Sequence, residues 1–146
     1  ERFYKHVPGQ GAGYRANGII NYLYTLIETK DWDTALGIVE KEAKNLSAYA
    51  DFHFSCFILF MQAILADTRK YVSYLPRIEQ SYLLCLEIGE VPANQGVGGT
   101  GSFRAAYNLG TWYEVAGDLN KARKYYQKAA GEKYQPAMER LALLAK

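Results

Sequence analysis

The sequence has few of the features that mark secreted or membrane-spanning proteins. Only two of its 146 residues are cysteine, Cys56 and Cys85, and both lie inside apolar stretches. A thiol in such a stretch behaves as a small apolar group, and two thiols do not make a disulfide framework. The pattern predicts a reduced, cytoplasmic protein, with one disulfide between two helices as the alternative. The longest apolar run, residues 54–65, falls well short of the roughly 20 residues that cross a bilayer, so we expect a core helix and no membrane span.

A large excess of charge of one sign is also missing. The chain has 17 basic and 15 acidic side chains, which leaves a formal net charge of +2. Nucleic-acid-binding domains are usually strongly basic, so we expect no nucleic acid among the partners. The basic run on one helix is interpreted as ordinary solvated surface, partly paired with nearby acids; it comprises Lys121, Arg123, Lys124 and Lys128.

The first residues hold little that forms regular structure. Proline and glycine occupy four of the six positions from Pro8 to Gly13, a composition typical of linkers. The chain opens with charged residues and without Met, so we expect no signal peptide and expect a piece of a longer protein. We predict a linker over residues 1–13 and one helical domain over residues 14–146, with enough apolar side chains for a core.

The most regular pattern lies between Arg104 and Lys146. Small and aromatic residues recur there at the spacing of two antiparallel helices: Ala106, Leu109, Gly110, Tyr113, Ala122, Tyr126 and Ala129. We expect Gly110 to let a second backbone approach closely. Residues 14–45 form a degenerate copy in which residues of similar type align: Leu26 with Tyr113, Asp31 with Asp118, Ala35 with Ala122, and Val39 with Tyr126. One such hairpin cannot bury its apolar faces alone, so neighbours are expected to stack on it.

Three hairpins and one final helix account for the domain. We place the hairpins at about residues 14–45, 47–90 and 102–131 and a capping helix at 135–145. The helix from Ser47 to Ala66 is apolar on almost every side and is expected to be central. Pro76 either kinks the helix that follows or lies near its start. In the last helix three residues are expected to face inward, Met138, Leu141 and Leu144, and three outward, Glu139, Arg140 and Lys146.

Two short motifs could bind ligands, but each has a structural explanation. Asp31-Trp32-Asp33 has the spacing of a carboxylate pair for Mg²⁺ or Mn²⁺, yet acids at a helix start are also what capping favours. Gly96, Gly98 and Gly101 satisfy a phosphate-binding glycine pattern, but no strand precedes them, which favours a connector, with Thr100 and Ser102 capping the next helix.

The two histidines and two cysteines form no recognisable catalytic arrangement. Asp51 and His53 point in different directions on a helix, and His53 is expected to hydrogen-bond within the stack. We therefore predict no catalytic site, no metal site and no cofactor in this stretch.

A groove is the remaining candidate site, because the first helices of stacked hairpins line a concave face. Asn21 and Asn108 occupy equivalent places in the first and last hairpins. The amides, phenols and guanidinium expected beside them suit an extended peptide or a carboxylate, although a solvated face with structural amides fits equally well. The candidate residues are Asn17, Asn21, Tyr24, Arg104, Tyr107, Asn108 and Thr111.

The hairpin over residues 104–146 resembles a tetratricopeptide (TPR) repeat, and Gly117-Asp118 with Lys128-Ala129-Ala130 is similar to its Sel1-like relative. The resemblance implies an all-α, right-handed superhelix of antiparallel helix pairs with about seven helices. It also implies that Asn21 and Asn108 hold the backbone of a bound peptide.

A wider resemblance spans roughly Asn17 to Leu144 and is carried by IEQSYLLCLEIGE (78–90) and GTGSFRAAYNLG (99–110). These segments are similar to the C-terminal helical region of bacterial family 2 glycosyltransferases. The resemblance implies a parent enzyme that uses a nucleotide sugar, a metal and a catalytic carboxylate. It also implies repeats that contact the catalytic domain, a second copy or the acceptor. No catalytic residue carries over, because no alternating strand and helix pattern is present here.

The sequence thus predicts a protein-interaction or scaffolding domain, the non-catalytic part of such an enzyme, whose partner is a protein, a peptide or its own catalytic domain. Two alternatives stay open. In one, the tyrosines stack on a small molecule or carbohydrate. In the other, the chain is a dimerisation module that forms a homo-oligomer.

Overall fold

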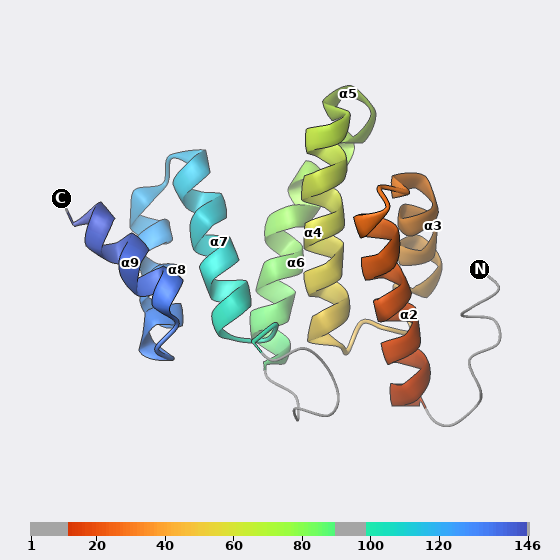
Figure 1. Cartoon of the computed structure of the whole chain (residues 1–146), viewed down its shortest axis with the longest axis horizontal. Helices are drawn as coiled ribbons and strands as arrows, with labels where there is room; N and C mark the ends of the chain where they lie inside the picture. Colours follow the sequence, from red (N-terminus) through yellow and green to blue (C-terminus); the bar gives the residue numbers. More distant parts are fainter. Residues whose placement is uncertain (1–11, 90–98, 146) are drawn as a thin grey trace.

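The computed structural model describes residues 12–89 and 99–145, which fold into helices without a β-strand. The all-α class is therefore confirmed. Seven α-helices of ten residues or more lie in this part of the chain: α2 (Ala12–Glu28), α3 (Trp32–Glu42), α4 (Ala50–Ala66), α6 (Leu75–Ile88), α7 (Phe103–Ala116), α8 (Leu119–Gly131) and α9 (Gln135–Leu144). They stand beside one another in an elongated row, with α2 and α3 near one end and α9 at the other (Figure 1).

The turn between α2 and α3 is closed by a left-handed residue. Lys30 has a φ of 63°, and the backbone N–H of the next residue, Asp31, donates to the Leu26 carbonyl at 2.9 Å. This geometry satisfies carbonyls that the helix end would otherwise leave unpaired. Asp31 occupies the position before α3, as expected, but its side chain makes no capping hydrogen bond.

The turn between α7 and α8 has the same backbone geometry. Gly117 has a φ of 89°, and the N–H of Asp118 donates to the Tyr113 carbonyl at 2.9 Å. When the first hairpin is aligned with the third, Gly117, Asp118 and Tyr113 fall on Lys30, Asp31 and Leu26. The one difference is that the Asp118 side chain accepts a hydrogen bond from the backbone of Lys121, at 3.1 Å.

The interiors of these two hairpins are filled in different ways. A Cβ atom on Gly110 of α7 would lie 2.7 Å from the Tyr126 ring of α8, so the glycine makes room for a ring. The expectation that a backbone approaches there is wrong. In the first hairpin, Leu23 and Val39 occupy the equivalent positions, and both are fully buried. The third hairpin thus pairs a small residue, Gly110, with a large one, Tyr126, whereas the first hairpin pairs two residues of intermediate size, Leu23 and Val39.

The central hairpin consists of α4 and α6. Every residue of α4 from Ala50 to Phe57 is buried, which agrees with the predicted central place of this helix. The Phe57 ring lies against Tyr82 of α6, with ring centroids 3.5 Å apart. A short helix, α5 (Thr68–Tyr71), and the 3-10 helix η1 (Val72–Tyr74) join the two. Pro76 lies in the first turn of α6, where its missing N–H costs nothing.

The last helix, α9, packs on α8 with a different face from the one expected. Ala137 is fully buried, whereas Met138 is 44% exposed. Arg140, expected to face outward, forms an ion pair with Glu114 of α7. The inward placement of Met138 is therefore wrong, whereas the Arg140 side chain remains 41% exposed while it pairs with Glu114. Leu141 and Leu144 are partly buried against the core, in the expected direction.

The hairpins contact one another along the row. Both α2 and α3 pack on α4, whereas α6 carries the contact with α7. Ion pairs tie α3 to the central hairpin, with Lys70 on Asp33 at 2.9 Å and Arg77 on Glu40 at 2.6 Å. Within the described ranges, no helix is both long and apolar enough to cross a membrane.

Candidate functional site

The three candidate residues of α2 differ in exposure. Asn21 is exposed and Asn17 is half-buried. Tyr24 is also half-buried, and its hydroxyl donates to an Asp51 carboxylate oxygen on α4 at 3.4 Å. Burial, reinforced by Asp51, raises the pKa of Tyr24, so this phenol stays protonated at neutral pH. It therefore presents a neutral hydroxyl at the junction of α2 and α4.

The candidate residues of α7 turn toward different neighbours. Arg104 is exposed, with its guanidinium carbon 5.9 Å from the centre of the Phe103 ring. Tyr107 faces α8 and α9, where its ring lies 5.6 Å from Tyr126 and 5.4 Å from Tyr134. Asn108 is half-buried and lies on the side of α7 that faces α6. The candidate residues of α7 therefore do not all share one face, since Tyr107 lies against Tyr126 and Tyr134 and Asn108 lies on the side of α6.

Tyr82 of α6 joins the candidate residues of α2 and α7. This tyrosine is fully buried, and its hydroxyl makes no hydrogen bond of good geometry within the described residues. Burial raises its pKa, while the nearby Asn108 side chain acts weakly in the opposite direction and the electrostatic influence of Tyr24 adds to the rise. The pKa of Tyr82 thus responds both to Asn108 of α7 and to Tyr24 of α2. In the sequence, Tyr82 is marked only by its place on an apolar helix face.

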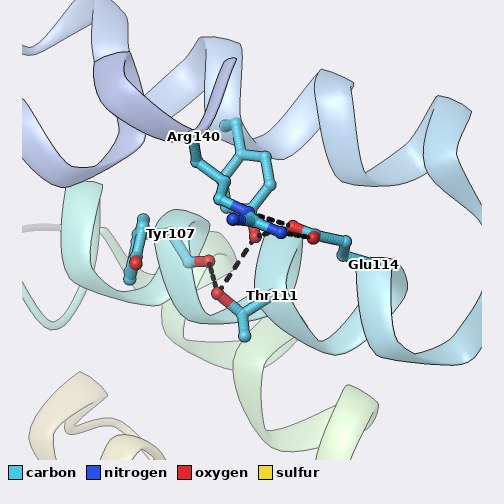
Figure 2. Close-up of polar contacts among 5 residues, drawn as sticks. Tyr107, Thr111, Glu114 and Arg140 are labelled. Carbon is cyan, nitrogen blue, oxygen red and sulfur yellow. Dashed lines mark hydrogen bonds and ion pairs between the residues drawn. The ribbon is translucent and has the colours of Figure 1, made fainter. Parts of the chain in front are cut away.

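A polar network between α7, α8 and α9 lies beside this region (Figure 2). The Tyr126 hydroxyl donates to Glu114 at 2.8 Å and also lies 3.2 Å from the hydroxyl of Thr111, a candidate residue. Arg140 of α9 donates from Nε to the same carboxylate at 2.7 Å, and its Nη2 atom bonds the second oxygen. Arg140 lowers the pKa of Glu114, and burial chiefly raises the pKa of Tyr126 to about 12.

Sequence reasoning missed Glu114 and Arg140. The two residues come from helices that are not consecutive, so neither helical spacing nor sequence distance links them. Their bidentate pair links α9 to α7. Arg104 and Thr111, which are exposed, lie on the same helix as Glu114. The network is fully paired and therefore structural rather than reactive.

The Asp31-Trp32-Asp33 motif is engaged in the fold. Asp33 accepts hydrogen bonds from the Tyr71 hydroxyl at 2.6 Å and from Lys70 at 2.9 Å. The bond from Tyr71 contributes most to lowering the pKa of Asp33. Across residues 12–89 and 99–145, no three His, Cys, Asp or Glu side chains are grouped so that they could hold a metal ion.

The histidine and the cysteines of the central hairpin are internal. The His53 Nε2 atom lies 2.8 Å from the Ser47 carbonyl, which agrees with the expected hydrogen bond within the stack. Cys56 and Cys85 are buried free thiols, and burial raises the pKa of both. Such thiols are protonated at neutral pH and are poor nucleophiles.

The glycine motif is described only in part, because Gly96 and Gly98 lie outside the described residues. Gly99 has a φ of 91°, and a Cβ atom there would lie 2.5 Å from the Phe103 ring. Both facts require glycine, so its role is to turn the chain over an aromatic ring into α7. Ser102 precedes α7 but makes no capping hydrogen bond with its side chain.

The sequence matches no protein-family model, no curated protein and no solved structure. The function is therefore argued from the geometry of the helices and their side chains.

Proposed function

We propose that the chain is a TPR-like helical repeat domain that binds an extended peptide across α2 and α7. The observation that carries the proposal is the continuous row of α2, α4, α6 and α7, in which each helix packs on the next. It supports a single continuous surface to which the first and third hairpins both contribute. The polar groups on it are the exposed amide of Asn21, the half-buried amide of Asn108 and the exposed guanidinium of Arg104. Such groups pair with the carbonyls, amides and carboxylates of a peptide.

The repeat architecture is part of this proposal. Its support is the shared turn geometry: Lys30 and Gly117 are both left-handed, and the same hydrogen bond follows each of them. A third turn resembles both, because Lys133 between α8 and α9 has a φ of 63°. Helices joined by the same turn and stacked side by side form a right-handed superhelix with a concave face.

We further propose that the domain is the non-catalytic C-terminal part of a family 2 glycosyltransferase and works in the cytoplasm. This proposal rests only on the resemblance of two short segments, residues 78–90 and 99–110, to such regions; no curated protein matches the chain. The bound peptide is then a segment of the catalytic domain or of a protein partner. In a homo-oligomer, the bound segment would come from a second copy of the chain. The isolated chain is expected to transfer no sugar from any nucleotide sugar.

The test is a peptide titration. Random peptides displayed on phage are selected against the chain, and one selected peptide is titrated while the fluorescence of Trp32 and Trp112 is followed. Asn108→Ala is expected to weaken binding about tenfold, because a buried peptide amide loses its partner. Asn120→Ala on α8, outside the groove, is the matched control and should bind as the parent does.

Two results would contradict the proposal. In the first, every selected peptide binds Asn108→Ala as tightly as it binds the parent chain. In the second, UDP-sugars or oligosaccharides saturate the tryptophan signal and the peptides do not, which would favour a carbohydrate site.

A further inference from the structure

Three lysines lie along one side of α8. Lys121, Lys124 and Lys128 are exposed, and their spacing of three and four residues places them on one side of the helix. We call these three residues the lysine stripe. The opposite side of α8 is buried in the hairpin through Ala122, Tyr126 and Ala129. The stripe therefore faces outward, on a different helix from the proposed groove.

None of the three lysines forms an ion pair within the described part of the chain. The basic residues that do so there are Arg15, Lys70, Arg77 and Arg140. The interpretation of this run as partly paired with nearby acids is therefore wrong for the described residues. Unpaired cations on one surface add their fields and attract an anionic partner.

Aromatic rings hold two of these lysines in place. The Lys121 ammonium lies 5.2 Å from the centre of the Tyr113 ring, and the Lys124 ammonium lies 5.3 Å from that of Tyr125. The two rings stack on each other with centroids 5.6 Å apart. Side chains positioned in this way lose less conformational freedom on binding.

The distribution of charge along the chain also favours an anionic partner for this part of the sequence. Residues 99–146 contain eight basic and four acidic side chains, a net charge of +4, whereas residues 1–98 contain nine and eleven, a net charge of −2. The net charge of +2 is thus unevenly distributed, and the C-terminal third of the chain is basic. This third is the part of the molecule that includes α8.

We propose that the lysine stripe binds an acidic segment of a partner protein. The rise from Lys124 to Lys128 is about 6 Å along the helix, and alternate side chains of an extended peptide repeat every 6.6–6.8 Å or so. Carboxylates at every second position therefore match the spacing of Lys124 and Lys128, whereas the rise from Lys121 to Lys124 is shorter, about 4.5 Å. Nucleic acid is disfavoured because the Tyr113 and Tyr125 rings are occupied by each other and by lysines. A membrane is disfavoured because the apolar side of α8 is buried.

The test uses a fluorescein-labelled peptide of six Glu-Ser repeats. Its anisotropy is followed with the whole chain at about 20 mM salt, where screening is weak. We expect saturable binding that Lys124→Glu/Lys128→Glu weakens about tenfold or more, because two attractions become repulsions. Lys44→Glu/Arg69→Glu changes the net charge equally on exposed residues elsewhere and should leave binding nearly unchanged. Circular dichroism checks that α8 stays folded in both variants.

The same variants are tested against oligo-uridylate and against vesicles containing phosphatidylserine. The proposal is overturned if the acidic peptide does not bind, or if both double variants weaken its binding equally. It is also overturned if oligo-uridylate or the vesicles bind more tightly than the peptide and depend on Lys124 and Lys128. Asn108→Ala should not change the affinity for the acidic peptide. The proposed function of the groove and the proposal for the lysine stripe are therefore tested independently.

Discussion

At the residue scale, Gly110 and Tyr126 decide how closely α7 and α8 pack. Gly110→Ala would place a methyl group 2.7 Å from the Tyr126 ring, so ring or helix must move. We expect the free energy of unfolding to fall by about 1–3 kcal/mol, as for other overpacked cores. Urea denaturation followed by circular dichroism measures the change.

Gly37→Ala on α3 is the matched control for this substitution. Gly37 is also inside a helix, but a Cβ atom there would have no neighbour within 4 Å. Alanine should then raise the free energy of unfolding by about 0.5–1 kcal/mol, because it favours the helix more than glycine does. A stabilising Gly110→Ala would contradict the close packing of the ring.

Tyr82 and Tyr126 are both buried tyrosines with opposite hydrogen-bonding status. The Tyr82 hydroxyl has no partner of good geometry in the described residues, whereas Tyr126 bonds Glu114 and Thr111. We expect Tyr82→Phe to leave the free energy of unfolding unchanged or to raise it, by up to about 2 kcal/mol, and Tyr126→Phe to lower it by about 1–2 kcal/mol. Thermal and urea unfolding of the two variants measures the difference. Equal losses in both would show that Tyr82 is hydrogen-bonded after all.

The sequence predicted the residues that depend on local pattern. Burial of Cys56 and Cys85 followed from their apolar neighbours, and the importance of Gly110 followed from its place among small and aromatic residues. The sequence could not predict the buried hydroxyl of Tyr82, unpartnered within the described residues, or the ion pair of Glu114 with Arg140. Both depend on which helices pack against each other. Polar partners far apart in sequence are set by packing rather than by periodicity.

At the element scale, the ion pair of Arg140 with Glu114 ties α9 to α7, in addition to the apolar packing of α9 on α8. Arg140 holds the pKa of Glu114 below its ordinary value, the Tyr126 hydroxyl acts in the same direction, and burial opposes both. A depressed folded-state pKa gives stability that is complete above the unfolded value of about 4.3. That stability is lost as the pH falls through the folded-state pKa.

We therefore expect the amide protection of α9 to fall in acid before that of α4. Hydrogen exchange at several pH values, corrected for intrinsic rates, measures it. Glu114→Gln should lower the protection of α9 at neutral pH and remove much of its dependence on pH. Glu139→Gln, an exposed acid on α9 itself, should behave as the parent chain does. Unchanged protection in Glu114→Gln would mean that apolar packing alone holds the helix.

The start and end signals of the helices were readable from the sequence, whereas the orientation of α9 was not. Gly117 and Asp118 mark a turn by their chemistry, and the equivalent turn uses Lys30 and Asp31. In α9, the small residue Ala137 takes the buried place that the larger Met138 was expected to fill. A short helix with apolar residues on several sides does not specify its own rotation, and close approach to α8 decides it.

At the scale of the whole molecule, the hairpins do not pack in one repeated way. α4 receives both helices of the first hairpin, whereas the third hairpin is contacted chiefly through α6. The interiors of the hairpins differ as well, with the Tyr126 ring over Gly110 in the third and Leu23 and Val39 buried in the first. The two hairpins thus share a turn geometry, at Lys30 and Gly117, while their interiors are filled differently.

The proposed function requires that the first and third hairpins share one peptide-binding surface. The most direct measurement is NMR of asparagine side chains labelled with ¹⁵N, recorded while a selected peptide is added. We predict that the amides of Asn21 and Asn108 both shift with one common affinity, whereas Asn120 on α8 stays still. A peptide that moves only one of the two amides, or neither, would contradict the shared surface.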